Sequence, residues 1–284
     1  MDTNRLKRFA TEARNILMQG VVHRLSALGF LPDGSVTEKP QQQGGGATFM
    51  GDIVTQDFYD KWQSLRRAVS ERKIEEVAEE AAYTWFNRLV AIRIMVKNGL
   101  ASPVLEYESD DVLIPILVSE ARQGRIPQMD DDSMRKLTAL LDDDSKTNEQ
   151  FALLIVAYCH SNPVINSCFG HISDYTELLL PANILTEGGF VHMLNNTEFI
   201  SEDDFKSPEL IGWLYQFYIS EKKDDVFASF KKGKKAEAKD IPAATQIFTP
   251  NWIVKYMVQN TVGRIYLNNN PYSDIKESIQ YLVK

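Results

Sequence analysis

The chain has 284 residues, 44% hydrophobic and 25% charged, which is ordinary for a globular protein with one large or two moderate domains. Its formal net charge of −8 argues against a surface that binds nucleic acid non-specifically all over. The sequence has no apolar run near the ~20 residues of a membrane helix and no signal segment, and its two cysteines favour a reducing cytoplasm over a disulfide-built secreted domain.

The first hundred residues are predicted to form helices separated by one loop. An amphipathic helix is expected over 1–28, because apolar residues recur there at steps of three and four. Residues 29–51 are rich in Gly, Pro and Gln and are expected to form a flexible loop, since they carry too little apolar surface to order themselves. Helices are then expected over 56–69 and 73–97, the second ending at Asn98-Gly99.

The rest of the chain is also predicted to be mainly helical. An extended segment is expected at 104–107, and short helices mixed with loops at 162–206. Further helices are expected over 110–123, 130–142, 147–160, 208–230, 250–267 and 274–283. The predicted fold class is therefore predominantly α, with a multi-helix domain over 52–240.

The most informative stretch is a predicted turn that becomes a helix near residue 250. Thr249 is a favourable N-cap, and Pro250 suits the first helical position, where its missing N–H costs nothing. Ile253, Val254, Met257 and Val258 then give the helix an apolar face. The unpaired N–H groups and partial positive charge of such a helix start suit a carboxylate or phosphate.

This stretch resembles a cofactor-binding motif of amino-type DNA methyltransferases of the type I and type IIG kind, close to Gln-x-Phe-Thr-Pro-x-x-Ile-Val. The matching residues are Gln246, Phe248, Thr249, Pro250, Ile253 and Val254. Three further islands, at 85–89, 178–181 and 213–218, resemble the N-terminal helical region of adenine-specific methyltransferases from bacteriophage-exclusion (BREX) defence systems, the PglX type. The resemblance runs from about Leu6 to Leu267 and is specific at these islands only.

The resemblance implies a function, a cofactor and partners. A protein of this family flips adenine out of duplex DNA and transfers a methyl group to it from S-adenosylmethionine. Duplex DNA is the implied partner, other BREX proteins or a phage inhibitor are further candidates, and no membrane is involved. The implied cofactor-binding residues are Gln246, Phe248, Thr249, Pro250 and Asn251.

The resemblance also implies an incomplete enzyme. The family places a Gly-rich cofactor loop after the Phe-Thr-Pro helix and an Asn-Pro-Pro-Tyr-like motif further on, and this chain has neither. Asn269-Asn270-Pro271-Tyr272 departs from the second motif at Asn270 and is better explained as a turn. We therefore expect an N-terminal portion that is inactive alone, without catalytic residues, in which 241–284 begins an α/β methyltransferase domain.

A lysine-rich segment precedes the Phe-Thr-Pro helix. Between Lys222 and Lys239 the sequence has seven lysines against three acidic residues, a local charge of +4. Its densest part consists of Lys231, Lys232, Lys234 and Lys235. These lysines are candidates for contacts with DNA phosphates, but a solvated loop that only keeps the surface soluble explains them equally well, because no aromatic residue interrupts the run.

Other polar groups fit ordinary structural roles better than a metal site. Cys159, His160, Cys168 and His171 have the residue types of zinc ligands but not the spacing, and the acidic runs 130–132 and 142–144 lack the pattern of a calcium loop. No metal is therefore predicted. Trp85 follows the helical steps of a core stripe. Arg88 and Arg93 are expected to pair with Glu79, Glu80 or the acidic loop near Asp110.

Two other functions remain open. The chain could be a non-catalytic helical module that binds protein, in which case Thr249-Pro250 is only a helix start. It could also belong to a type IIG restriction–modification protein, although residues 1–100 lack the nuclease motif that such a protein requires.

Overall fold

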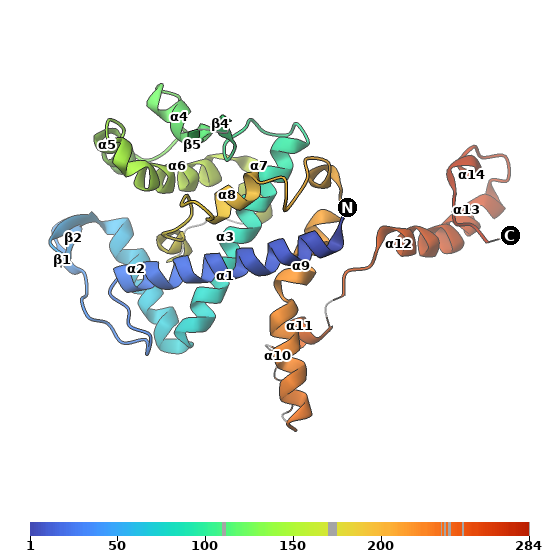
Figure 1. Ribbon diagram of the computed structural model, residues 1–284, viewed down its shortest axis with the longest axis horizontal. Coiled ribbons are helices and arrows are strands. Elements are labelled where there is room, and N and C mark those ends of the chain that lie inside the picture. The colour runs from blue at the N-terminus through green and yellow to red at the C-terminus, as the bar shows by residue number, and fades with distance from the viewer. Residues whose placement is uncertain are drawn as a thin grey trace. The chain divides into compact units, whose positions relative to one another are not determined.

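A computed structural model describes residues 1–109, 112–169, 175–233, 235, 237, 240–245 and 247–283 (Figure 1). The chain divides into two compact units, Met1–Lys206 and Ser207–Lys284, which are treated separately below. The described residues are mostly helical and their strands are short, so the predicted fold class is confirmed. Along the sequence, the boundary between the compact units falls at 206/207, whereas the methyltransferase domain was predicted to start at 241.

The core of the first unit forms between two long helices, α1 (Thr3–Ala27) and α3 (Ile74–Lys97), which pack against each other (Figure 1). The rings of Phe9, Phe86 and Phe190 meet there, with centroid distances of 5.5 to 6.3 Å, and all three side chains are buried. Aromatic side chains bury large apolar areas, so this cluster stabilises the pairing of the two helices. The Asp2 carboxylate caps α1 by accepting from the N–H groups of its first turn.

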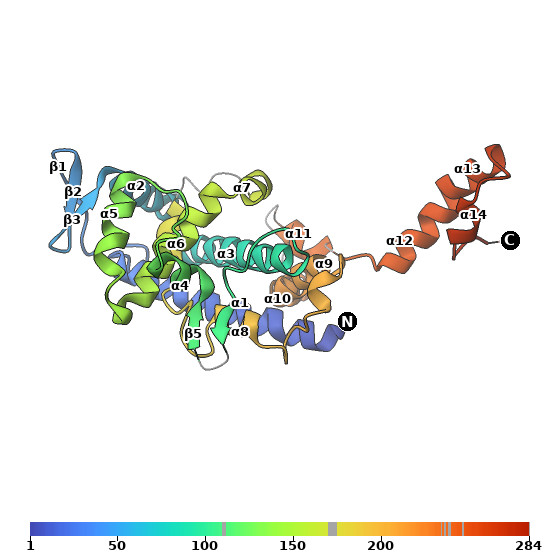
Figure 2. The same cartoon turned by 90° about the horizontal axis from the view of Figure 1, so that it is seen from above.

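The segment predicted as a loop over 29–51 contains two strands, and that prediction is wrong at their positions; a third strand follows it. Gln41–Gln43 (β1), Gly46–Phe49 (β2) and Asp52–Thr55 (β3) form an antiparallel sheet beside α2 (Gln56–Glu71) (Figure 2). Phe49 is buried, and its ring lies 5.6 Å from that of Phe58 and 6.3 Å from that of Trp62. One aromatic side chain packed on α2 thus fixes a segment whose composition alone predicts a loop.

The middle of the first unit follows the prediction with one correction. Within the region predicted as a helix over 110–123, Val112–Pro115 form strand β5, paired with β4 (Tyr107–Ser109), and α4 follows. The other elements of this unit are α4 (Ile116–Arg122), α5 (Asp131–Leu140), η1 (Asp144–Lys146), α6 (Thr147–Ser161), α7 (Pro163–Phe169), η2 (Tyr175–Leu179), α8 (Phe190–Asn195) and η3 (Asp204–Lys206).

The second unit consists of short helices. The predicted helix 208–230 breaks at Ile219 into α9 (Leu210–Tyr218) and α10 (Ser220–Lys231), followed by α11 (Ile241–Thr245). The predicted helix 250–267 is α12 (Asn251–Val258), a π-helical turn (Gln259–Gly263) and α13 (Arg264–Asn269). Helix α14 (Ile275–Ser278) is shorter than predicted. The side chains of Gln259 and Asn260 accept from the N–H groups of Tyr281 and Val283, which ties the C-terminal residues to the π turn.

Candidate functional site

The Phe-Thr-Pro segment is an extended turn that leads directly into α12, all within the second unit. Helix α12 begins at Asn251 with Pro250 as its N-cap, and no side chain caps it. The predicted cap by Thr249 is therefore wrong, because the helix starts one residue later than proposed and the exposed Thr249 lies outside it. Gln246 lies outside the described residues. The Thr249 side chain thus makes no N-cap hydrogen bond to α12 and is exposed to solvent.

Phe248 is fixed on α9. Its N–H donates to the Gln216 side-chain oxygen at 2.7 Å, and its ring meets that of Trp213 edge-on with centroids 5.1 Å apart. Gly212 makes this approach possible, because a Cβ at that position would overlap the Phe248 ring. Three residues one helical turn or less apart on α9 therefore form a seat for Phe248, and this seat sets the conformation of the turn.

A carboxylate of the same chain already occupies the start of α12. The Glu209 carboxylate, next to the start of α9, accepts from the Asn251 N–H at 2.7 Å. A carboxylate at a helix N-terminus satisfies an otherwise unpaired donor and interacts favourably with the helix dipole. The expectation that the first N–H groups are free for a ligand is therefore wrong at Asn251. Glu209 lies 42 residues away in sequence, so no local pattern could have indicated it.

The apolar face predicted for this helix is present but uncovered. Helices α12 and α13 have no buried residue, so the apolar side chains predicted at helical spacing remain at least partly exposed. Trp252, Met257 and Val262 are 57%, 58% and 67% exposed. The exposed apolar surface of α12–α13 consists of Trp252, Val254, Tyr256, Met257, Val258, Val262, Ile265 and Tyr266. Exposed apolar side chains concentrated along one helical segment favour the interpretation of an interaction surface.

The lysine cluster lies at the end of α10. Lys231 is the last residue of that helix, Lys232 is its C-cap, and both are exposed, as is Lys235. Lys234 lies outside the described residues. Phe227, which was not among the predicted site residues, precedes the cluster by one turn; it is exposed, with the Lys223 ammonium 6.0 Å from its ring centroid. Lys223, Phe227 and Lys231 recur every four residues on α10, and this spacing could have indicated from the sequence that they lie on one face of the helix.

Neither the cysteines nor the core arginines form a reactive site. Cys159 is buried, and burial raises the pKa of its thiol to about 12, so it behaves as a small apolar side chain. Arg93 pairs with Glu106 of the acidic segment near Asp110, as predicted, and it also contacts Glu202, which the sequence did not indicate. Arg88 lies over the rings of Trp85 and Phe169. Asp110 and His171 lie outside the described residues, and no group of metal-ligating side chains occurs in the part of the chain that is described.

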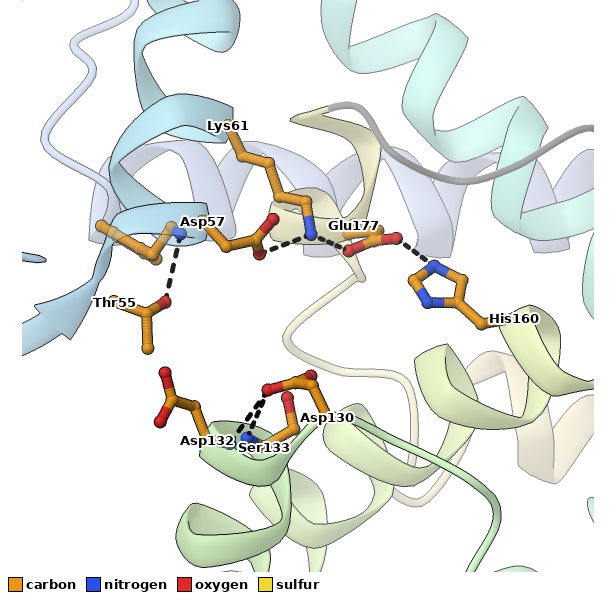
Figure 3. Close-up of polar contacts among 9 residues, drawn as sticks. Thr55, Asp57, Lys61, Asp130, Asp132, Ser133, His160 and Glu177 are labelled. Carbon is orange, nitrogen blue, oxygen red and sulfur yellow. Dashed lines mark hydrogen bonds and ion pairs between the residues drawn. The ribbon is translucent and has the colours of Figure 1, made fainter. Parts of the chain in front are cut away.

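A connected polar cluster occurs in the first unit instead. The Lys61 ammonium lies between the carboxylates of Asp57 and Glu177, at 2.6 and 2.5 Å, and His160 contacts the other oxygen of Glu177 at 2.5 Å (Figure 3). The hydrogen bonds from Lys61 to the two carboxylates raise its pKa against the opposing effect of burial. These contacts join α2, α6 and η2, so the cluster fixes three elements of the unit to one another.

Two of the sequence islands meet in the same part of the first unit. The indole N–H of Trp85 donates to the Thr176 carbonyl at 3.0 Å, and Trp85 is fully buried. The island at 178–181 begins two residues after Thr176, at the end of η2. These islands therefore serve the core of the first unit, whereas the Phe-Thr-Pro island and the one at 213–218 are joined in the second unit through Trp213 and Gln216.

The helices of the described residues are short or polar compared with a membrane span. Within the described ranges, no single helix has the length and hydropathy of a span, and the pair Asp144–Ser161 with Pro163–Phe169 reaches these limits only jointly, across an 84° bend. Much of the apolar surface of α6 is buried inside the first unit, as expected for a core helix.

Comparison with known proteins gives two relatives that match nearly the whole chain. It is 34% identical over 297 residues, covering 100% of this chain, to an adenine-specific methyltransferase BrxX of Escherichia coli O9:H4 (strain HS). It is 35% identical over 290 residues, covering 94% of this chain, to an adenine-specific methyltransferase PglX of Lacticaseibacillus casei (strain Zhang). No family model matches the chain.

These relatives confirm the resemblance seen in the sequence. The chain is homologous to part of BREX-type adenine-specific methyltransferases, and it spans 23% of the length of each of the two relatives. The homology extends over both compact units, and therefore includes the Phe-Thr-Pro segment together with the α9 residues that hold it.

Proposed function

We propose that the chain is part of a longer, site-specific DNA methyltransferase that acts on the exocyclic amino group of adenine in bacteriophage defence. The proposal is supported by two relatives whose names describe that activity and whose similarity extends along nearly all of this chain. Both relatives are about four times as long as this chain, which leaves room for the Gly-rich loop and the adenine-binding motif that it lacks.

We further propose that residues 246–251 form one wall of the S-adenosylmethionine pocket. The observation that carries this is the contrast within the turn: Phe248 and Asn251 are bound to α9, while Thr249 between them is exposed. A preorganised turn can border a ligand without the cost of ordering a loop. The cofactor supplies the transferable methyl group, and the protein groups here only orient it.

Glu209 refines which groups can contact the cofactor. Its carboxylate uses the Asn251 N–H, so that donor does not serve the cofactor carboxylate while Glu209 stays in place. The proposed contacts are therefore the Thr249 hydroxyl and the half-buried side chains of Phe248 and Pro250. Gln246 remains a candidate from the motif alone. This is a partial site, because the motif supplies one wall of the proposed pocket and no residues for the facing wall.

The uncovered apolar surface of α12–α13 fits the same proposal. An α/β methyltransferase domain needs helices packed on its sheet, and such helices bury an apolar face. We infer that the rest of this domain covers Trp252, Met257 and their neighbours in the complete enzyme. The same surface also fits the competing function, a non-catalytic module that binds another protein. The coding sequence beyond Lys284 separates them, because only the enzyme requires a Gly-rich loop followed by an Asn-Pro-Pro-Tyr-like motif.

Cofactor binding tests the proposed wall. In the complete enzyme, Thr249→Val should weaken S-adenosylmethionine binding by about tenfold, the effect of losing one hydrogen bond to a charged ligand. Thr245→Val is the matched control, because among the described residues the Thr245 hydroxyl donates to the Ile241 carbonyl within α11. Calorimetry on the isolated 284 residues should show very weak binding. Micromolar affinity in that experiment would contradict the partial-site proposal.

DNA binding tests the lysine cluster. We propose that Lys231, Lys232, Lys234 and Lys235 contact DNA phosphates, with Phe227 beside them. Reversing the four charges in the complete enzyme should weaken binding to all DNA sequences and reduce the salt dependence. The control reverses four exposed lysines elsewhere: Lys7, Lys39, Lys73 and Lys276. Equal affinities of the two variants at low salt would remove the lysine cluster from the DNA interface.

A further inference from the structure

A large cavity lies within the first unit. Its volume is about 810 Å³, in the range of small-molecule sites. Its walls come from α1, α5, α6 and the segment 180–184. Most of the lining is aliphatic, including Leu140, Leu153 and Ile184, and it contains no aromatic ring. The cavity therefore offers no stacking surface for a nucleobase, and it differs in chemistry from a nucleotide pocket.

The wall opposite α5 and α6 is rigid. The Asn183 amide donates to the Ile16 carbonyl at 3.1 Å, and a Cβ on Gly20 would overlap the Asn183 side chain. Arg24 donates through Nε to the Leu178 carbonyl at 2.9 Å, which holds its guanidinium in the cavity wall. The segment is therefore fastened to α1 at three positions over two turns, and the cavity is formed before any ligand binds.

One cation that lines the cavity, Arg24, interacts electrostatically with Glu149 without forming an ion pair with it. Glu177 uses both carboxylate oxygens for Lys61 and His160 (Figure 3), and Glu149 pairs with Lys146 at 3.2 Å. Arg24 has no ion pair with a described residue, and the Leu178 carbonyl is the single hydrogen-bond acceptor found for it in the described ranges. Its two terminal nitrogens keep donors in the fork geometry that matches carboxylate and phosphate. Lys136, at the rim, has no ion pair with a described residue either.

We propose that this cavity binds a small organic anion, with its carboxylate or phosphate on the Arg24 fork and an aliphatic body against α5 and α6. Arg24 is half-buried, so a charged hydrogen bond there is stronger than one on the open surface. Burial disfavours the charged form of Arg24 and lowers its pKa, an effect that Glu149 opposes. An anionic ligand would offset the same cost, and this site is independent of the Phe-Thr-Pro segment.

Binding of decanoate, decyl phosphate and decanol to the 284-residue chain tests the proposal by calorimetry. At least one anion should bind about tenfold or more tightly than decanol, which has the same body without the charge. The tighter of the two anions identifies the head group as carboxylate or phosphate. Arg24→Gln should remove this preference, and Ala152→Trp, which places an indole in the cavity, should abolish binding of all three compounds.

The control is Arg66→Ala, which removes an exposed arginine of the same unit and should leave the affinities unchanged. Ala152→Trp keeps Arg24 and its bond to Leu178, so it remains informative if Arg24→Gln destabilises the fold. The proposal is overturned if neither anion binds more tightly than decanol at millimolar concentration. It is also overturned if a folded Ala152→Trp variant binds them as the parent chain does.

Discussion

The core of the first unit and the helices α12–α13 of the second use similar apolar side chains in opposite ways. Trp85 is fully buried and bonds the Thr176 carbonyl through its indole N–H, whereas Trp252 is 57% exposed. Both sit on helices with apolar residues at helical spacing. Amphipathic spacing therefore predicts that a helix needs a partner, but it does not tell whether that partner lies in the same chain. In the first unit α1 supplies it, and for α12–α13 the described residues do not.

The largest expected effect tests this contrast directly. Trp85→Ala should lower the free energy of unfolding by about 3–5 kcal/mol, because it leaves a cavity and an unpaired carbonyl. Trp252→Ala should change it by less than about 0.5 kcal/mol, as for other exposed positions. Urea denaturation followed by circular dichroism measures both. Equal losses for the two variants would mean that Trp252 is packed in solution and that α12 already has its partner.

Within the second unit, Phe248 differs from the exposed apolar side chains of α12–α13 because it packs on α9. A substitution of Gly212 tests this contact. Gly212→Ala places a methyl group where the Phe248 ring lies, at a cost of about 1–3 kcal/mol for this overpacked contact. The Phe248 amide, bonded to Gln216, should then exchange its hydrogen faster. Gly45→Ala is the control, because a Cβ there meets nothing within 4 Å. An unchanged exchange rate at Phe248 would show that the seat is not occupied.

The sequence predicted the elements that depend on local pattern and missed those that depend on distant partners. Helical periodicity correctly located α1, α2, α3 and α6, and Asn98-Gly99 correctly ended α3. The sheet at 41–55 was missed because its Gln and Gly composition favours a loop, while the stabilising contact is Phe49 on α2. A local cap by Thr249 was predicted, but the N–H at the start of α12 donates to the carboxylate of Glu209, 42 residues away. The cavity at Arg24 combines several segments and has no motif.

Because Cys159 is buried, the stability of the first unit is expected to decrease with pH in the alkaline range. The pKa of this thiol is raised from 9.0 to about 12, so above pH 9 the unfolded chain loses a proton that the folded chain keeps. The free energy of unfolding should therefore fall with rising pH, by at most about 1.4 kcal/mol per unit from this group. Cys159→Ala should reduce that slope. Cys168→Ala should not, because Cys168 is exposed.

The smallest effect concerns the cap of α5, which forms one wall of the cavity. The Asp130 carboxylate accepts from the N–H groups of Asp132 and Ser133, and the hydrogen bonds from Ser133 lower its pKa (Figure 3). A lowered pKa stabilises the folded state at neutral pH, and this stability is lost as the pH falls below the unfolded value of 3.8. Asp130→Ala should cost about 1 kcal/mol or less at pH 7, since the group is exposed and a cap contributes that much.

Asp131→Ala is the matched control, because Asp131 is also exposed and acidic in the first turn but caps no N–H group in the described structure. The two variants should differ at pH 7 and converge towards pH 3, where Asp130 is protonated in the unfolded chain. Hydrogen exchange in α5 should rise only in Asp130→Ala. If both variants fray the helix equally, the wall of the cavity is held by charge near the helix end and not by the cap itself.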